Sequence, residues 1–184
     1  MAQPGCPPAD GSYTRLPMDW SVTLDILASG RDLTRLEAGA LPLEIEAVDL
    51  VDLMRRGVIT HLASNGSAVI HDYEMARWGG TSEDVEAGLT DGSFGMAEET
   101  GREMNEAITR GASEEWGLGE ALGRALESRD DLPHPDRSLL LAARRHGIPF
   151  TVHAALGAEI IHQHPAADGA AIGATSHRDF RRLA

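Results

Sequence analysis

Two segments of this 184-residue chain repeat the same order of features. They read LVDLMRRGVITHLASNG over residues 50–66 and LLLAARRHGIPFTVHAALG over residues 139–157. In each, an apolar helical stretch ends in Arg-Arg, and a glycine and a short apolar run carrying a histidine follow. Helices that lead into strands through short glycine turns are the units of a parallel α/β sheet. The repeat therefore predicts two parallel strands that occupy equivalent places in one fold.

Apolar periodicity and capping residues predict the remaining elements. Ser138 is expected to cap one helix, Gly57 and Gly147 to follow two helices, and Thr175 or Ser176 to cap the last one. Residues 65–66 are expected to form a turn. Strands are expected at 58–63 and 148–155, and helices at 18–28, 43–56, 67–78, 81–89, 98–111, 117–128, 138–146 and 174–184. The acidic residues between 83 and 127 are typical of a solvated helical face.

Length and composition predict a single α/β domain over residues 17–184 behind a disordered tail at 1–16. No run approaches the roughly 18 apolar residues of a membrane span. The single cysteine, Cys6, lies in the tail, which excludes an intramolecular disulfide and fits a cytoplasmic protein. The net charge of −13 argues against nucleic-acid binding, because no positive field would attract the phosphates.

The chain contains no lysine, since all 16 basic residues are arginines. Catalysis through a lysine Schiff base or through pyridoxal phosphate is therefore excluded, and so is a Walker-type phosphate loop. Any chemistry must use carboxylates, histidines, hydroxyls, arginines or backbone amides.

The first candidate site follows the first predicted strand. It consists of Asn65, Gly66, Ser67, His71, Asp72 and Glu74. A tight glycine turn at the end of a parallel strand exposes helix N–H groups to a phosphate or carboxylate. On a helix, a residue at position 71 neighbours one at position 74, so the carboxylate could fix the tautomer of the histidine. The alternative is a helix cap, a glycine turn and a surface pair.

The second candidate site follows the second predicted strand and consists of His153, Glu159, His162 and His164. Imidazole and carboxylate groups suit zinc or another divalent metal, with His153, His162 and His164 as ligands. The alternative is a set of histidines that border a pocket or face solvent. Residues 90–95 are either a plain turn or a pocket wall. Residues 117–123 lack a preceding strand, so they indicate a glycine-rich helix start instead of a dinucleotide loop.

Read together, residues 57–101 and 148–173 resemble the bacterial deoxyhypusine synthase-like proteins. The H-D-x-E pattern at 71–74 is also similar to the NAD-binding domain of the ornithine cyclodeaminase part of bifunctional arginine dihydrolases. The similar stretches cover roughly residues 46–184. The resemblance implies a Rossmann-like, doubly wound, mostly parallel sheet flanked by helices. It also implies NAD bound at the carboxyl ends of the strands, in a homo-oligomer.

The resemblance assigns roles position by position. The nucleotide or substrate would be bordered by the six residues of the first candidate site, and an adjoining wall would be formed by Thr81, Ser82, Glu83 and Asp84. His153, Gly157 and Glu159 would contact substrate. Deoxyhypusine synthase proper works through a lysine imine, which this chain cannot form. Similar proteins also carry flanking strands that are not recognisable here. The chain is therefore expected to be a truncated relative or to complete its sheet with a partner subunit.

Three hypotheses about function follow. The first is an NAD-dependent enzyme acting on a small amine, amino acid or polyol-type metabolite, with His71 or His153 as general base and Glu74 or Glu159 orienting it. The second is a metal-dependent lyase, hydrolase or isomerase built on the three histidines of the second site. The third is an inactive remnant that keeps a binding or oligomerisation role. All three predict a small-molecule ligand or self-association, with no nucleic-acid or membrane partner.

Overall fold

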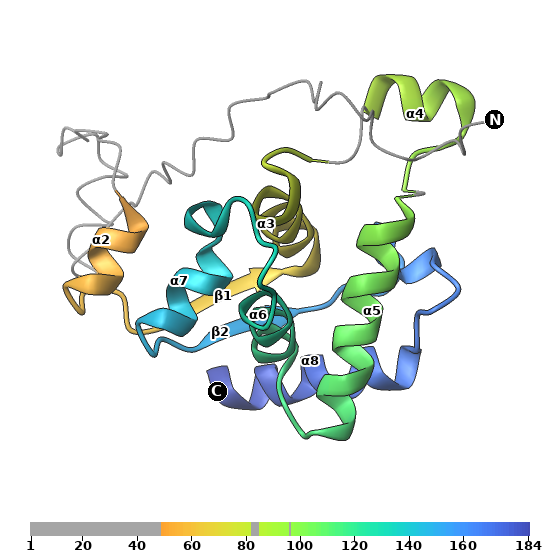
Figure 1. Cartoon of the computed structure of the whole chain (residues 1–184). Coiled ribbons are helices and arrows are strands. Elements are labelled where there is room, and N and C mark those ends of the chain that lie inside the picture. Colours follow the sequence, from red (N-terminus) through yellow and green to blue (C-terminus); the bar gives the residue numbers. More distant parts are fainter. Residues whose placement is uncertain (1–48, 82–84, 96) are drawn as a thin grey trace, which may run out of the picture.

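The computed structural model describes residues 49–81, 85–95 and 97–184. These residues form a mostly helical α/β structure around two short strands (Figure 1). The elements are α2 (Leu50–Arg55), β1 (Leu62–Asn65), α3 (Gly66–Trp78), α4 (Val85–Asp91), α5 (Glu98–Ser113), α6 (Leu118–Glu127), the 3₁₀ helix η1 (Pro135–Arg137), α7 (Leu139–Arg145), β2 (Phe150–His153), the 3₁₀ helix η2 (Ile160–Gln163) and α8 (Gly169–Leu183). The predicted tail, the predicted helix at 18–28 and residues 82–84 lie outside the described residues.

The two strands pair in parallel, as the repeat predicts. The register places Leu62 opposite Phe150 and the last residue of β1 opposite the last residue of β2. Helix α8 runs along β2 and closes its outer edge with side chains. The amide of Val152 donates to Asp179 Oδ2 at 2.8 Å, and the amide of Ala154 donates to Ser176 Oγ at 2.9 Å. These bonds satisfy backbone groups that would otherwise form an open strand edge.

Several predicted boundaries are wrong. Within the described residues, the helix expected at 43–56 begins at Leu50, the strand expected at 148–155 spans Phe150–His153, and the helix expected at 81–89 ends at Asp91. Two further boundaries have an identifiable cause, and the first is that of β1. The strand was expected at 58–63 but spans Leu62–Asn65, because the pairing with β2 selects the residues that become a strand. The turn expected at residues 65–66 is absent. Instead, Asn65 ends β1 and at once caps α3, with its Oδ1 accepting the Ala68 amide at 2.9 Å.

The start of α8 is the second correction. The helix begins at Gly169, capped by Asp168, whose Oδ1 accepts the Ala170 amide at 2.8 Å. The expected caps, Thr175 and Ser176, lie inside the helix. The Thr175 hydroxyl donates to the carbonyl of Ala171 within the helix at 2.8 Å, whereas Ser176 contacts β2.

The remaining capping predictions are confirmed. The hydroxyl oxygen of Ser138 accepts the amide of Leu141 at 3.1 Å and caps α7. Gly57 and Gly147 follow the Arg-Arg ends of α2 and α7 with φ of +70° and +67°. Glycine adopts this left-handed conformation without a Cβ penalty, so both repeats leave their helix in the same way.

The main core lies between the strands and helices α3, α5, α6, α7 and α8. Its fully buried side chains include Tyr73, Met104, Ile108, Leu122, Leu126, Leu140, Val152 and Ile172. The glycine-rich start of α6 packs against this sheet. A Cβ at Gly119 would collide with the carbonyl oxygen of Phe150 on β2, which explains this glycine without a phosphate loop. Within the described residues, no helix has the length and apolarity needed to cross a membrane.

Candidate functional site

The two candidate sites of the sequence meet at one end of the sheet. The parallel register places Asn65, the last residue of β1, opposite His153, the last residue of β2. The chain then turns into α3 after β1, and passes Gly157, with φ of +87°, after β2. Because the carboxyl ends of parallel strands lie at the same edge, the repeated motifs form a single region of the surface.

The carboxylate of Glu159 joins the two motifs. Its Oε1 accepts the amide of Gly66 at 3.0 Å and the amide of Ala155 at 2.8 Å. Glu159 is buried, with its side chain only 2% exposed. A Cβ at Gly66 would overlap the carboxyl group, so this glycine permits the close approach. The carboxylate therefore lies at the N-terminus of α3, where free N–H groups and the helix dipole favour an anion.

His162 completes this arrangement. Its Nε2 lies 3.0 Å from Glu159 Oε2, and its side chain is 9% exposed. An ionised carboxylate only accepts hydrogen bonds, so this contact places a proton on Nε2. The other ring nitrogen, Nδ1, is buried without a hydrogen-bond partner among the described residues. In the neutral ring, Nδ1 keeps the lone pair that can take a proton.

A second polar chain lies beside the strands. The hydroxyl oxygen of Thr151 is 3.1 Å from His61 Nε2 and 3.2 Å from His153 Nε2. Behind it, burial raises the pKa of Asp179, while amide hydrogen bonds and the nearby His153 act in the opposite direction. His153 thus belongs to the end of the sheet, as predicted, and its hydrogen-bond partner is a hydroxyl group.

The residues predicted on α3 separate into different environments. Ser67 and His71 are exposed, whereas Glu74 is 1% exposed. The carboxylate of Glu74 accepts the hydroxyl of Thr100 at 2.9 Å and so links α3 to α5. His71 and Glu74 were expected to pair on one helix face. Instead, the side chain of His71 faces solvent and that of Glu74 faces the core.

Asp72 connects α3 to α7. Its Oδ2 accepts the hydroxyl of Ser138 at 2.6 Å, and its Oδ1 accepts the amide of Leu139 at 2.6 Å. The amide of Leu140 adds a third bond at 3.3 Å. Burial raises the pKa of Asp72 to about 6, and the three hydrogen bonds oppose that shift. Asp72 was predicted to border the nucleotide, whereas the hydrogen-bond donors to its carboxylate all lie at the start of α7.

The three histidines of the metal alternative have different partners. His153 contacts Thr151, His162 contacts Glu159, and His164 Nε2 lies 2.9 Å from Glu98 Oε2. The part of the chain that the structure describes contains no group of three or more His, Cys, Asp or Glu side chains that could hold a metal ion. The metal alternative therefore gains no support from this arrangement. Of the predicted adjoining wall, only Thr81 is described, and it is half-buried.

Two features of the site were missed from the sequence. The contact between Glu159 and the Gly66 amide spans 93 positions, so no local pattern indicates it. His162 appeared as a metal ligand, whereas it is the partner of this carboxylate. An acid inside the apolar stretch AEII was the one available signal, because an acid buried in such a stretch requires hydrogen-bond donors.

The protein is therefore a mostly helical α/β protein that has a buried carboxylate and a buried histidine near the ends of two parallel strands. No family model, curated protein or solved structure matches the chain. The assignment of function therefore depends on the geometry of the strand ends.

Proposed function

We propose that the protein is an NAD-binding enzyme of small-molecule metabolism, of the deoxyhypusine synthase-like kind. One observation carries the proposal: the carboxylate of Glu159, from the second motif, is bound to the amide of Gly66, from the first. Ligands of parallel α/β proteins bind outside the carboxyl ends of the strands, where these motifs meet. A Rossmann-type sheet with further strands, in a homo-oligomer, is part of the proposal.

The position of Glu159 determines how a nucleotide would lie. In many dinucleotide-binding proteins the pyrophosphate contacts the N-terminus of the first helix. Here that position at α3 holds a carboxylate, which repels phosphate but accepts hydrogen bonds. Among the residues that the structure describes, Oε2 contacts only His162 and keeps lone-pair capacity. A ribose hydroxyl or a substrate amine is therefore the group that this end of the site accepts.

His162 is the proposed general base, in place of His71 or His153. Glu159 fixes the ring and stabilises the imidazolium that forms when Nδ1 takes a proton from the substrate. Because Nδ1 is buried in this structure, the proposal requires a local movement that uncovers this atom when substrate binds. NAD, when bound, would accept a hydride from the carbon that bears the hydroxyl or amino group, and the proton that Nδ1 takes would come from the oxygen or nitrogen of that group. The substrate thereby loses a hydride and a proton, as in the oxidation of an amine or an alcohol. No lysine imine is involved, because the chain has no lysine.

The test is calorimetric titration of the full chain with NAD⁺ and NADH. Micromolar affinity for either form is the expected result. Glu159→Gln should weaken binding about ten- to a hundred-fold, because a charge-assisted hydrogen bond to a ribose hydroxyl is worth roughly 1.5–3 kcal/mol. His71→Gln is the matched control: this exposed histidine on α3 should leave binding unchanged.

Circular dichroism of each variant separates lost binding from lost folding. Affinity weaker than millimolar for both nucleotide forms would rule out the NAD proposal. If Glu159→Gln lowered stability while the wild-type chain bound neither form, the carboxylate would be a structural link between β2 and α3. The non-enzymatic alternative would then stand.

A further inference from the structure

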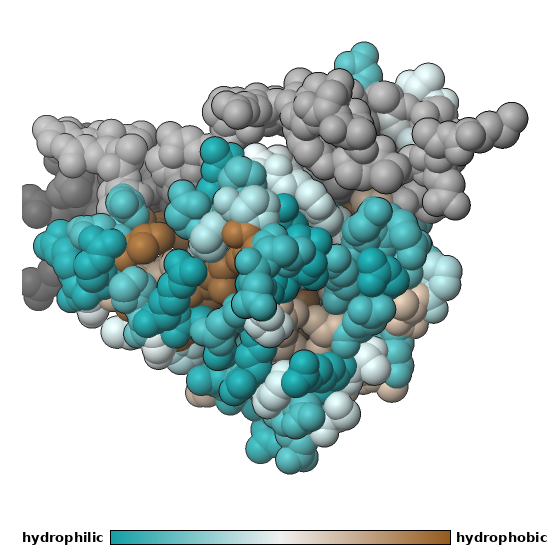
Figure 2. Space-filling model, in the orientation of Figure 1, coloured by the Kyte–Doolittle hydropathy of each residue, from teal (hydrophilic) through white to brown (hydrophobic). Residues whose placement is uncertain are grey.

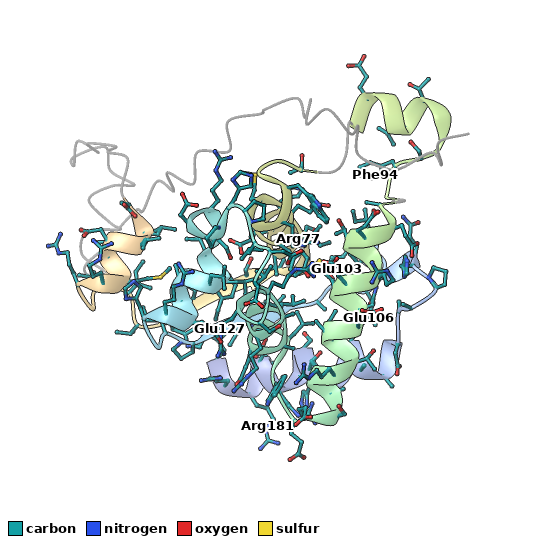
Figure 3. The ribbon with its side chains drawn as sticks, viewed as in Figure 1. Arg77, Phe94, Glu103, Glu106, Glu127 and Arg181 are labelled. Atoms are coloured by element: carbon teal, nitrogen blue, oxygen red, sulfur yellow. The ribbon has the colours of Figure 1, made fainter. Side chains whose placement is uncertain are left out.

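A groove of about 490 Å³ lies between α5 and α6, away from the strand ends. Its floor is formed by the small side chains Ala107, Ala121 and Ala125, with Trp116 at one end and Tyr73 at the other. Figure 3 labels two of its acidic residues, Glu103 and Glu106, on α5, and Glu127 at the end of α6. Figure 2 shows that this face is mostly hydrophilic, with hydrophobic atoms mainly around α7.

At the Tyr73 end of the groove, the polar side chains already form hydrogen bonds and ion pairs with one another. The carboxylate of Glu103 accepts the Tyr73 hydroxyl at 3.0 Å and the Arg77 guanidinium at 3.1 and 3.2 Å. Arg129 adds a contact at 3.2 Å. This carboxylate therefore has four donors around it and little capacity left for a ligand.

The Trp116 end is different. The guanidinium of Arg124 lies 4.4 Å from the centroid of the indole ring and is held there by Glu120, at 2.8 and 3.0 Å. The guanidinium of Arg110 lies 5.5 Å from the same ring. Two cations therefore border one aromatic side chain.

Among the described ionic residues that line the groove, Arg110 is the one for which the structure shows no ion pair. Glu106 pairs with Arg102, and Glu127 pairs with Arg144. Within the described ranges, Arg110 forms no ion pair, and its side chain is exposed in the last turn of α5. An anion that enters the groove can pair with this guanidinium without breaking an existing ion pair.

We propose that this groove binds a small organic anion with a flat, aromatic or apolar body. The anionic group, a carboxylate or a phosphate, pairs with Arg110, which offers several N–H donors in one plane. The body lies on the alanine floor beside the indole of Trp116. The volume suits such a ligand, since small-molecule pockets commonly measure about 300–1,000 Å³. This site is independent of the proposed nucleotide site.

The experiment uses phenylacetate and phenyl phosphate as probes, and benzyl alcohol and benzylamine as neutral and cationic controls. Binding is followed by the NMR signal of the Trp116 indole N–H in the full chain, assigned with Trp116→Phe. Both anions should produce saturable shifts, and both controls should bind at least about five-fold more weakly, a difference of about 1 kcal/mol. A preference for one anion identifies carboxylate or phosphate as the favoured group.

Arg110→Gln should weaken the binding of both anions by at least about five-fold. Arg145→Gln is the matched control, because Arg145 is also an exposed arginine in the last turn of a helix, on α7. Arg145→Gln should leave the binding of both anions unchanged. Equal binding of benzyl alcohol and phenylacetate, or equal binding of anions by the Arg110→Gln variant, would overturn the proposal. Absence of any Trp116 response at millimolar probe would do so too.

Discussion

Replacement of Asp72 by asparagine should remove a pH dependence that this carboxylate gives to the free energy of unfolding. Asp72 is buried between α3 and the start of α7, and burial raises its pKa from 3.8 to about 6. Two pKa units correspond to about 3 kcal/mol, because each unit is worth about 1.4 kcal/mol. Asparagine keeps an acceptor for the amide of Leu139 and carries no charge at any pH.

The direction follows from the proton balance. Between pH 3.8 and 6 the folded chain holds a proton on Asp72 that the unfolded chain has released. The stabilisation from this proton is complete below pH 3.8 and is lost as the pH rises through 6. The stability of the wild type minus that of Asp72→Asn should therefore fall by roughly 2 kcal/mol between pH 4 and pH 7.

Urea unfolding followed by circular dichroism at pH 4, 5, 6 and 7 measures this difference directly. Asp136→Asn, at an exposed position in η1, is the control for the loss of an unburied aspartate. If the hydrogen bonds from Ser138, Leu139 and Leu140 outweighed burial, the folded pKa would lie below 3.8. The asparagine variant would then lose most stability at neutral pH, and that result would refute the reasoning.

Three other substitutions test the packing and the charge network. Gly119→Ala places a Cβ against the Phe150 carbonyl on β2, which cannot move freely, and should cost about 2–3 kcal/mol in urea unfolding. Gly123→Ala meets the flexible side chain of Arg144 instead, at 2.8 Å, so the gain in helix propensity should keep its effect within about 1 kcal/mol of zero. Glu103→Gln removes the partly buried carboxylate between Arg77 and Arg129, which keep only the exposed Asp131 as an ion-pair partner among the described residues, and should cost about 2 kcal/mol. Burial and Glu103 raise the pKa of Tyr73, so the same variant should lower that pKa in a titration at 295 nm; an unchanged titration would show that burial alone is responsible.

The sequence was sufficient for elements that depend on local signals. The helix cap at Ser138 and the left-handed glycines at 57 and 147 follow from residues within a few positions of one another. The parallel relation of the two repeats follows from the same local order of features found twice. Asp168 was also a readable cap, because an aspartate there is followed at once by a helix-forming run. Thr175 and Ser176 obscured that signal, since both residue types cap helices as well.

What the sequence could not predict depends on partners that are distant along the chain. The limits of β1 follow from where β2 begins, because only residues opposite Phe150–His153 can form the ladder. The H-D-x-E pattern indicated a single contact surface, yet its three ionisable residues face solvent, α7 and α5. Burial and orientation on α3 are set by the helices that pack around it, and these come from later in the chain.

The two repeats are one element of the fold used twice, and the difference between them builds the site. After β1 the chain enters α3 directly, whereas after β2 it passes Gly157 and η2 before α8 begins at Gly169. That longer path returns Glu159 to the amide of Gly66 at the start of α3. A helix start that carries its own buried carboxylate has little attraction left for a phosphate. The same carboxylate orients His162, so the detour in the second repeat supplies both the acceptor and the base of the proposed site.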